Sequence, residues 1–399
     1  MAGQVPGRGY LRDRDDEDSA EVSFVELFFD LVFVFAVTQL AAYLGEHFTP
    51  EGLLRAWVLF LMLWWLWINT SWATNRLDHD RGVVRGIIFA MMAAGLMVSV
   101  SIPMAFESRG LAVAIAYVAM QLGRSLFMVW ALRRHGEERQ SRTFLRVALW
   151  FAISGALWIG GGLAEGDARV LLWALALVVD LVVPWLGFRL PGLGASSASE
   201  WDVEGEHLAE RCGLFIILAL GETLLVTGAR METLEWSAVT LAAFGVSLLG
   251  TLAMWWIYFD VGVHHGSKAI GRTDDPGRLA RFAYTYVHLP IVAGIVGAAV
   301  GDKFLLAHPG EPATPKEALV ILGGPALFLL GNYLFKNATS RRWPLSHVVG
   351  LALLGAATLA LSMLTILGLA ATAVVILVLV AILERILLRS RAAARSGVN

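Results

Sequence analysis

The stretch VSFVELFFDLVFVFAVTQLA, residues 22–41, is apolar over the length that a helix needs to cross a bilayer. Two carboxylates interrupt it: Glu26 and Asp30 lie four residues apart and therefore share one helical face. Similar segments follow along the chain, and we expect each to span as a helix because lipid offers no partners for exposed backbone groups. The twelve expected spans are residues 21–44, 53–75, 83–106, 111–133, 143–164, 170–190, 206–229, 236–261, 280–301, 318–337, 345–366 and 368–389.

The composition is that of an all-α polytopic membrane protein. Hydrophobic residues make up 57% of the 399 residues and charged residues only 16%, whereas soluble proteins carry about 25% charged residues. The net charge of −2 indicates no nucleic-acid partner, and the partner that the composition predicts is the lipid bilayer. The single cysteine, Cys212, allows no internal disulfide and no cysteine-based metal site. The sequence contains no Walker loop or hydrolase motif, so we expect no enzyme, cofactor or metal.

The distribution of lysine and arginine predicts the orientation. With the N-terminus in the cytosol, 23 of the 31 basic residues fall at inner loops and span ends, and 6 fall at outer ones. Positive charge gathers on the cytosolic side of membrane proteins, so we expect both termini in the cytosol and an even number of spans. The polar, acidic residues 1–20 predict a disordered cytosolic arm, and residues 391–399 a cytosolic tail.

The two halves of the chain resemble each other. Residues 62–69, MLWWLWIN, match residues 253–260, AMWWIYFD, and Glu26 in the first span corresponds to Glu210 in the seventh. Because a unit of six spans returns the chain to the same side, two such repeats would share one orientation. The sequence therefore predicts two parallel six-helix repeats joined by a cytosolic linker, over residues 21–190, 206–390 and 191–205 respectively.

Ionisable side chains inside spans are costly, so each is a candidate for a functional site. Glu222 lies about 16 Å deeper in the seventh span than Arg211 and on the same face. Arg211 and Arg124 are candidate counter-ions for the carboxylates. The structural alternative is that these residues cap helices or pair between them. The predicted transport or polar-core residues are Glu26, Asp30, Gln39, Arg124, Glu210, Arg211, Glu222 and His288.

Gln39 and His288 belong to this set for different reasons. On the repeat alignment Gln39 falls at the depth of Glu222, so polar residues recur at one level in both halves. His288 could relay a proton because histidine titrates near neutral pH. A lone histidine in a span is more often a hydrogen-bonding group between helices.

Two stretches resemble the bacterial low temperature requirement A family. Residues 22–40 are similar to one of its signatures, and residues 207–222, HLAERCGLFIILALGE, are similar to the other. The tryptophan-rich second span ending in Asn75 and Arg76 also fits, and Cys212 stands where phenylalanine is more usual. The resemblance covers nearly the whole chain. It implies a bacterial inner-membrane protein linked by name to growth in the cold, and it implies no molecular activity.

A looser likeness is to the lysosomal potassium and proton channel family, which also duplicates a six-span unit. These features favour a channel or secondary transporter for a small cation, a proton or a small solute, with Asp30 and Glu222 as its coupling or selectivity carboxylates. One alternative is a membrane scaffold or sensor of lipid state with no transport activity. The other is an intramembrane lipid-modifying enzyme. The oligomeric state stays open, a homo-oligomer included.

Overall fold

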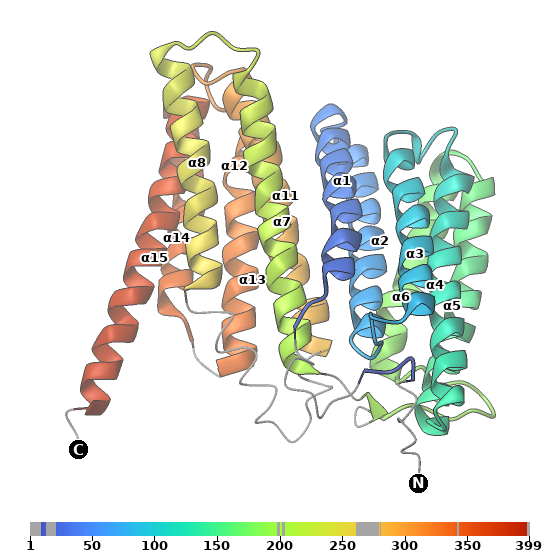
Figure 1. Ribbon diagram of the computed structural model, residues 1–399. Helices are drawn as coiled ribbons and strands as arrows, with labels where there is room; N and C mark the ends of the chain where they lie inside the picture. The colour runs from blue at the N-terminus through green and yellow to red at the C-terminus, as the bar shows by residue number, and fades with distance from the viewer. Residues whose placement is uncertain are drawn as a thin grey trace. The chain divides into compact units, whose positions relative to one another are not determined.

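The computed structural model describes residues 9–12, 21–197, 200–201, 204–260, 279, 281–340 and 343–396. Over these ranges the chain is helical, and its only extended pairings are isolated bridges. Twelve helical segments of the described chain are long and apolar enough to cross a membrane. The protein is therefore an all-α polytopic membrane protein, as its sequence predicts (Figure 1).

Helices α1 to α6 belong to the first of two compact units. They are α1 (Phe24–Glu46), α2 (Pro50–Thr74), α3 (Gly82–Ser101) with η2 (Ile102–Met104), α4 (Gly110–Arg134), α5 (Glu138–Leu163), and α6 (Gly166–Val182) with η3 (Val183–Leu186). Within this unit α1 packs against α2 and α3, and α4 packs against α5. Local sequence sets the helix ends: at the start of α2, Thr49 Oγ1 accepts from Gly52 N at 3.1 Å, and Pro50 follows it.

The second compact unit contains most of α7 and all later helices. These are α7 (Gly205–Met231), α8 (Ala238–Phe259), the π-helix η5 (Arg281–Tyr286), α11 (His288–Ala307), α12 (Pro315–Ile321), α13 (Gly323–Ser340), α14 (Leu345–Ala357), η6 (Thr358–Met363) and α15 (Ile366–Ser396). Helices α11 and α13 approach closely through glycine. A Cβ on Gly294 would lie 2.4 Å from Phe328 N, so only glycine allows this contact.

The boundary between the units falls inside α7, between Arg211 and Cys212. The first two turns of α7 therefore belong to the first unit, and the rest of the helix belongs to the second. The linker that the sequence predicts, residues 191–205, lies just before this boundary. That the two halves superpose as parallel repeats stays a prediction.

The last apolar run forms two spans, but they divide earlier than expected. The predicted break lies near Gly368, whereas η6 ends at Met363 and α15 begins at Ile366. Leu364 is extended, and Thr365 Oγ1 accepts from Gly368 N at 3.1 Å. A threonine cap thus starts the last helix, and the glycine lies within its first turn.

Residues 9–12, which belong to the predicted N-terminal arm, pair with the loop that follows α2. Leu11 forms an antiparallel bridge with Leu77, and Arg12 N donates to Arg76 O at 3.0 Å. These pairings hold Arg12 beside the loop between α2 and α3. The other residues of the predicted arm, 1–8 and 13–20, lie outside the described residues.

Candidate functional site

The start of α1 holds the first carboxylate of a buried polar cluster. Ser23 precedes the helix, and both its N–H and its hydroxyl donate to Glu26 Oε2, at 3.1 and 3.0 Å. Glu26 is the third residue of α1, where free backbone N–H groups and the helix dipole favour an anion. Its side chain is fully buried, so its charge needs further partners inside the protein.

The first two turns of α7 supply those partners. Arg211 Nη1 lies 2.7 Å from Glu26 Oε1, and Arg211 Nη2 donates to Asp30 Oδ1 at 2.7 Å. One guanidinium thus bridges both carboxylates of α1. The bridge is possible because Glu26 and Asp30 lie one helical turn apart, a separation that the planar fork of arginine spans.

Trp67, about two turns before the end of α2, completes the surroundings of Asp30. Its indole Nε1–H donates to Asp30 Oδ1 at 2.8 Å, and the Arg211 guanidinium carbon lies 5.8 Å from the centre of a Trp67 ring. Asp30, Trp67 and Arg211 have no exposed surface. Asp30 is therefore bound by the positive charge of Arg211 and by the indole N–H of Trp67, away from bulk water.

The hydrogen bonds around His207 define which of its ring nitrogens donates and which accepts. Asn75, at the end of α2, donates its side-chain N–H to His207 Nδ1 at 3.1 Å and to Glu204 O at 2.8 Å. Because Nδ1 accepts this bond, the ring proton lies on Nε2, which donates to Glu26 Oε2 at 3.1 Å. His207 thus serves as a hydrogen-bond donor to Glu26.

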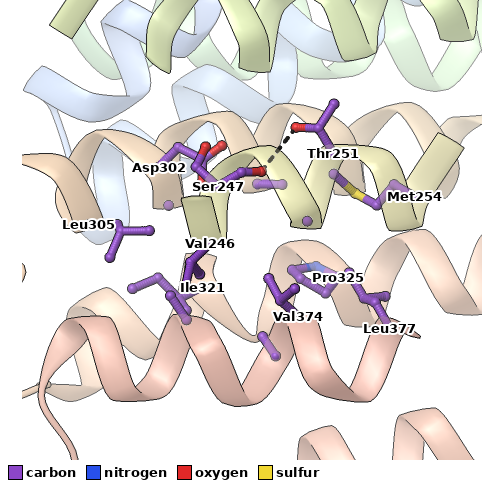
Figure 2. Close-up of a pocket in the computed structure, with 15 residues that line it drawn as sticks. Val246, Ser247, Thr251, Met254, Asp302, Leu305, Ile321, Pro325, Val374 and Leu377 are labelled. Atoms are coloured by element: carbon purple, nitrogen blue, oxygen red, sulfur yellow. Dashed lines mark hydrogen bonds between the residues drawn. The ribbon is translucent and has the colours of Figure 1, made fainter. Parts of the chain in front are cut away.

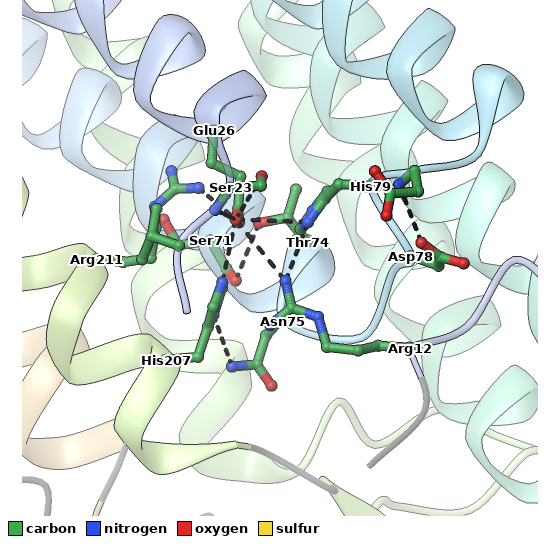
Figure 3. A network of polar contacts seen from close by, with 12 residues as sticks. Arg12, Ser23, Glu26, Ser71, Thr74, Asn75, Asp78, His79, His207 and Arg211 are labelled. Atoms are coloured by element: carbon green, nitrogen blue, oxygen red, sulfur yellow. Dashed lines mark hydrogen bonds and ion pairs between the residues drawn. The ribbon is translucent and has the colours of Figure 1, made fainter. Parts of the chain in front are cut away.

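His79, in the loop after α2, occupies the other side of Glu26 (Figure 3). Arg12 Nη2 donates to His79 Nδ1 at 3.0 Å, which places the ring proton on Nε2. His79 Nε2 is buried and has no hydrogen-bond partner among the described residues. Burial lowers the pKa of His79 to about 4, against the opposing attraction of Glu26, and burial also lowers the pKa of Arg12. His79 is therefore neutral at neutral pH.

The cluster is balanced in charge and able to respond to protons. Two carboxylates, Glu26 and Asp30, face two guanidiniums, Arg12 and Arg211, and two imidazoles lie beside Glu26. A proton on His79 would remove the acceptor that Arg12 uses and would turn an N–H towards Glu26 Oε2, 3.5 Å away. No group of three histidine, cysteine or acidic side chains over the described ranges is arranged to hold a metal ion.

Two candidates of the first unit lie outside this cluster. Glu210 is exposed and accepts the Val22 N–H at 3.2 Å. Arg124 is buried in α4 and donates to Thr70 Oγ1 at 3.1 Å and to the Gln121 side chain. Arg124 therefore contacts neutral oxygens at these positions, and Arg211 is the arginine that binds the carboxylates of α1.

The remaining candidates have separate surroundings. Gln39 is partly exposed on α1, nine residues beyond Asp30. Glu222 is buried on the part of α7 that belongs to the second unit. His288, also in the second unit, donates from Nδ1 to Ala283 O at 2.8 Å and accepts at Nε2 from the Tyr258 hydroxyl at 2.9 Å. Both ring nitrogens are thus satisfied between helices, which favours the structural interpretation of His288.

Sequence reasoning missed the partners that lie at or beyond the span ends. Arg12 comes from the N-terminal arm, and Asn75 and His79 come from the end of α2 and the following loop. No spacing within a helix connects these residues to Glu26. Their signal in the sequence is their position near the end of a predicted span.

A family model matches most of this chain. The model of the family described as bacterial low temperature requirement A protein (LtrA) matches residues 21–382. The chain belongs to this family. The match covers every residue of the cluster except Arg12.

A relative among the curated proteins shows how far the similarity extends. An uncharacterized protein of Rhizobium meliloti (strain 1021) is 42% identical over 377 residues, which cover 94% of this chain and 92% of the relative. No solved structure matches the chain. Family membership and the twelve apolar helices of the described chain together identify an integral membrane protein.

Proposed function

We propose that this LtrA-family protein is a channel or secondary transporter that moves a small cation, a proton or a small solute across the bacterial inner membrane. We further propose that both termini face the cytosol, since basic residues gather at the span ends and loops on that side. The cluster of Glu26, Asp30, Arg211 and the two histidines would then lie at the cytosolic ends of α1, α2 and α7.

One observation supports this proposal above the others: two carboxylates and one arginine are fully buried within predicted spans. Apolar residues of similar volume would fold as well or better, because taking paired charges out of water often costs more than their attraction returns. Charged residues in spans are therefore more often associated with transport or switching than with stability alone.

The chemistry of the cluster suits a two-state element. Arg211 binds α7 to α1 through two charge-assisted contacts. Neutralising Asp30, or adding a proton at His79, changes the charge balance that favours this arrangement. A proton gradient could thus bias the equilibrium between two positions of the start of α7.

A flux assay tests the proposal directly. Purified protein is reconstituted into liposomes, and uptake of H⁺, Na⁺, K⁺ and a panel of small solutes is followed with trapped fluorescent or radioactive reporters. We expect flux of at least one of them above that of protein-free vesicles. Asp30→Asn should lower this flux by about tenfold or more, which corresponds to about 1.4 kcal/mol of lost stabilisation.

Asp167→Asn is the matched control, because Asp167 is an exposed aspartate of the same unit. It should leave the flux unchanged. Folded, reconstituted protein that moves nothing on the panel would overturn the proposal. Equal flux in Asp30→Asn and the wild-type protein would remove the cluster from the mechanism.

The short, fully buried ion pairs of Arg211 favour a second candidate function. Arg211 contacts both carboxylates at 2.7 Å with no exposed surface, an arrangement that also suits a permanent structural lock. A membrane scaffold or sensor of lipid state would need no more than this. On that alternative, Asp30→Asn lowers stability, and there is no flux to lose.

A further inference from the structure

The second unit contains a small, mostly apolar cavity that lies outside the charge cluster. Residues of α8, α11, α13 and α15 line it, together with Ile321 at the end of α12 (Figure 2). Its volume is about 40 Å³, enough for one to three water molecules or a single small ion, since one water needs about 10–15 Å³. Most of its walls are apolar, and its polar side chains are Asp302, Ser247 and Thr251.

Asp302 is the only charged residue among the fifteen described residues that line the cavity. It lies on α11, one and a half turns before the helix ends, and its carboxylate lies beside Ser247 of α8 (Figure 2). No lysine, arginine or histidine lines the same space. An ionised carboxylate between apolar walls needs a counter-charge, and none of the lining side chains provides one.

The hydroxyl groups around Asp302 are held in place from α7. Thr227 Oγ1 lies 2.7 Å from Ser247 Oγ, and Thr223 Oγ1 lies 2.7 Å from Thr251 Oγ1. Each hydroxyl has one proton and two lone pairs, so these pairings leave acceptor capacity on the oxygens of Ser247 and Thr251. Ser247 and Thr251 are also one turn apart on α8, which places both on one side of the cavity.

The lining therefore presents one carboxylate and two oriented hydroxyl oxygens in a space of ionic size. Hard oxygen ligands suit a small hard cation. A single negative charge in low dielectric is neutralised by a single positive charge, so a divalent ion would leave the site with excess charge.

We propose that Asp302, Ser247 and Thr251 form a binding site for one monovalent cation, either a proton on the carboxylate or an alkali-metal ion held between the carboxylate and the two hydroxyls. The site depends only on contacts within the second unit. It holds whether or not the protein carries out transport.

Two measurements on the purified full-length protein in lipid nanodiscs test this assignment. The first follows the infrared carbonyl band of a protonated carboxylic acid across pH, at constant ionic strength. The second follows the thermal unfolding temperature at alkaline pH with lithium, sodium or potassium chloride, against choline chloride as the ionic-strength control.

For a proton site we expect a pH-dependent band that Asp302→Asn removes. For an alkali-metal site we expect one of the three salts to raise the unfolding temperature by several °C and to weaken the band at constant pH. Asp302→Asn should abolish the response to salt, and the exposed-site control Asp167→Asn should keep both signals.

Two further variants keep the carboxylate and so remain informative if Asp302→Asn does not fold. Ser247→Ala and Thr251→Val should weaken an alkali-metal response by about tenfold in half-saturating concentration while the carboxylic acid band persists. A metal response unchanged in both variants would overturn the role of the hydroxyls. If the wild-type protein shows neither the band nor a selective salt response, the site itself is refuted.

Discussion

Replacing Arg211 by methionine should be the most damaging single change in the charge cluster. Arg211 is fully buried and contacts Glu26 and Asp30 at 2.7 Å each, so its removal leaves two carboxylates without their shared cation. Breaking one buried pair in this way costs about 3–5 kcal/mol in the free energy of unfolding. For a unit of this size that loss lowers the unfolding temperature by about 6–20 °C.

The assay is thermal unfolding of the purified protein in detergent, followed by circular dichroism. Arg230→Met is the matched control, because Arg230 is an exposed arginine near the other end of α7. It should shift the unfolding temperature by no more than a surface substitution does, within about 0.5 kcal/mol.

A triple variant separates charge balance from packing. Combining Arg211→Met with Glu26→Gln and Asp30→Asn removes both negative charges together with the positive one. If uncompensated charge causes the loss, the triple variant should recover most of the stability that Arg211→Met loses, because neutral replacements of buried ion pairs are often tolerated. A triple variant no more stable than Arg211→Met would refute this reasoning and would assign the effect to packing against Trp67.

Three further outcomes are expected, two from contacts in the structure and one from the distribution of basic residues. Trp67→Phe removes the indole donor to Asp30 and should cost about 1.5–3 kcal/mol, measured by thermal unfolding, while Trp57→Phe at an exposed position should cost little. The pKa of His79 is lowered from 6.5 to about 4 in the folded protein. As the pH falls, the imidazole therefore takes up a proton in the unfolded chain before it does so in the folded protein. The free energy of unfolding should fall by about 3 kcal/mol as the pH drops from 6.5 to 4. His79→Gln should flatten that part of the pH profile, and an unchanged slope would contradict the assignment. A C-terminal reporter that is active only in the periplasm should stay silent, and a signal would disprove the cytosolic C-terminus.

The sequence alone predicts the fold class because hydrophobic length and charge are local properties. A segment such as 22–41 has few alternatives in a membrane: only a helix satisfies its backbone. The spacing of Glu26 with Asp30, and of His207 with Arg211, likewise shows from the sequence that each pair shares a helical face. These are consequences of helical periodicity, and the structure agrees with them.

Span ends are less well determined by sequence, and this affected one site. The predicted ninth span stops at residue 301, which leaves Asp302 in a loop, whereas α11 continues to Ala307. Local sequence assigns a charged residue near the end of a span to the following loop, because charge is unfavourable inside the bilayer. The added turn places Asp302 beside Ser247 of α8, and this contact depends on packing between helices.

Partners across helices were decided by tertiary structure alone. Helical periodicity shows which residues share a face of one helix. It does not show which face of another helix packs against that face. Arg211 is separated from Asp30 by 181 residues, and Arg124 was an equally reasonable counter-ion until packing placed it against Thr70 and Gln121. Which arginine pairs with Asp30 depends on distances of a few ångströms between side chains of different helices. Distances of that size are set by the packing of the whole unit.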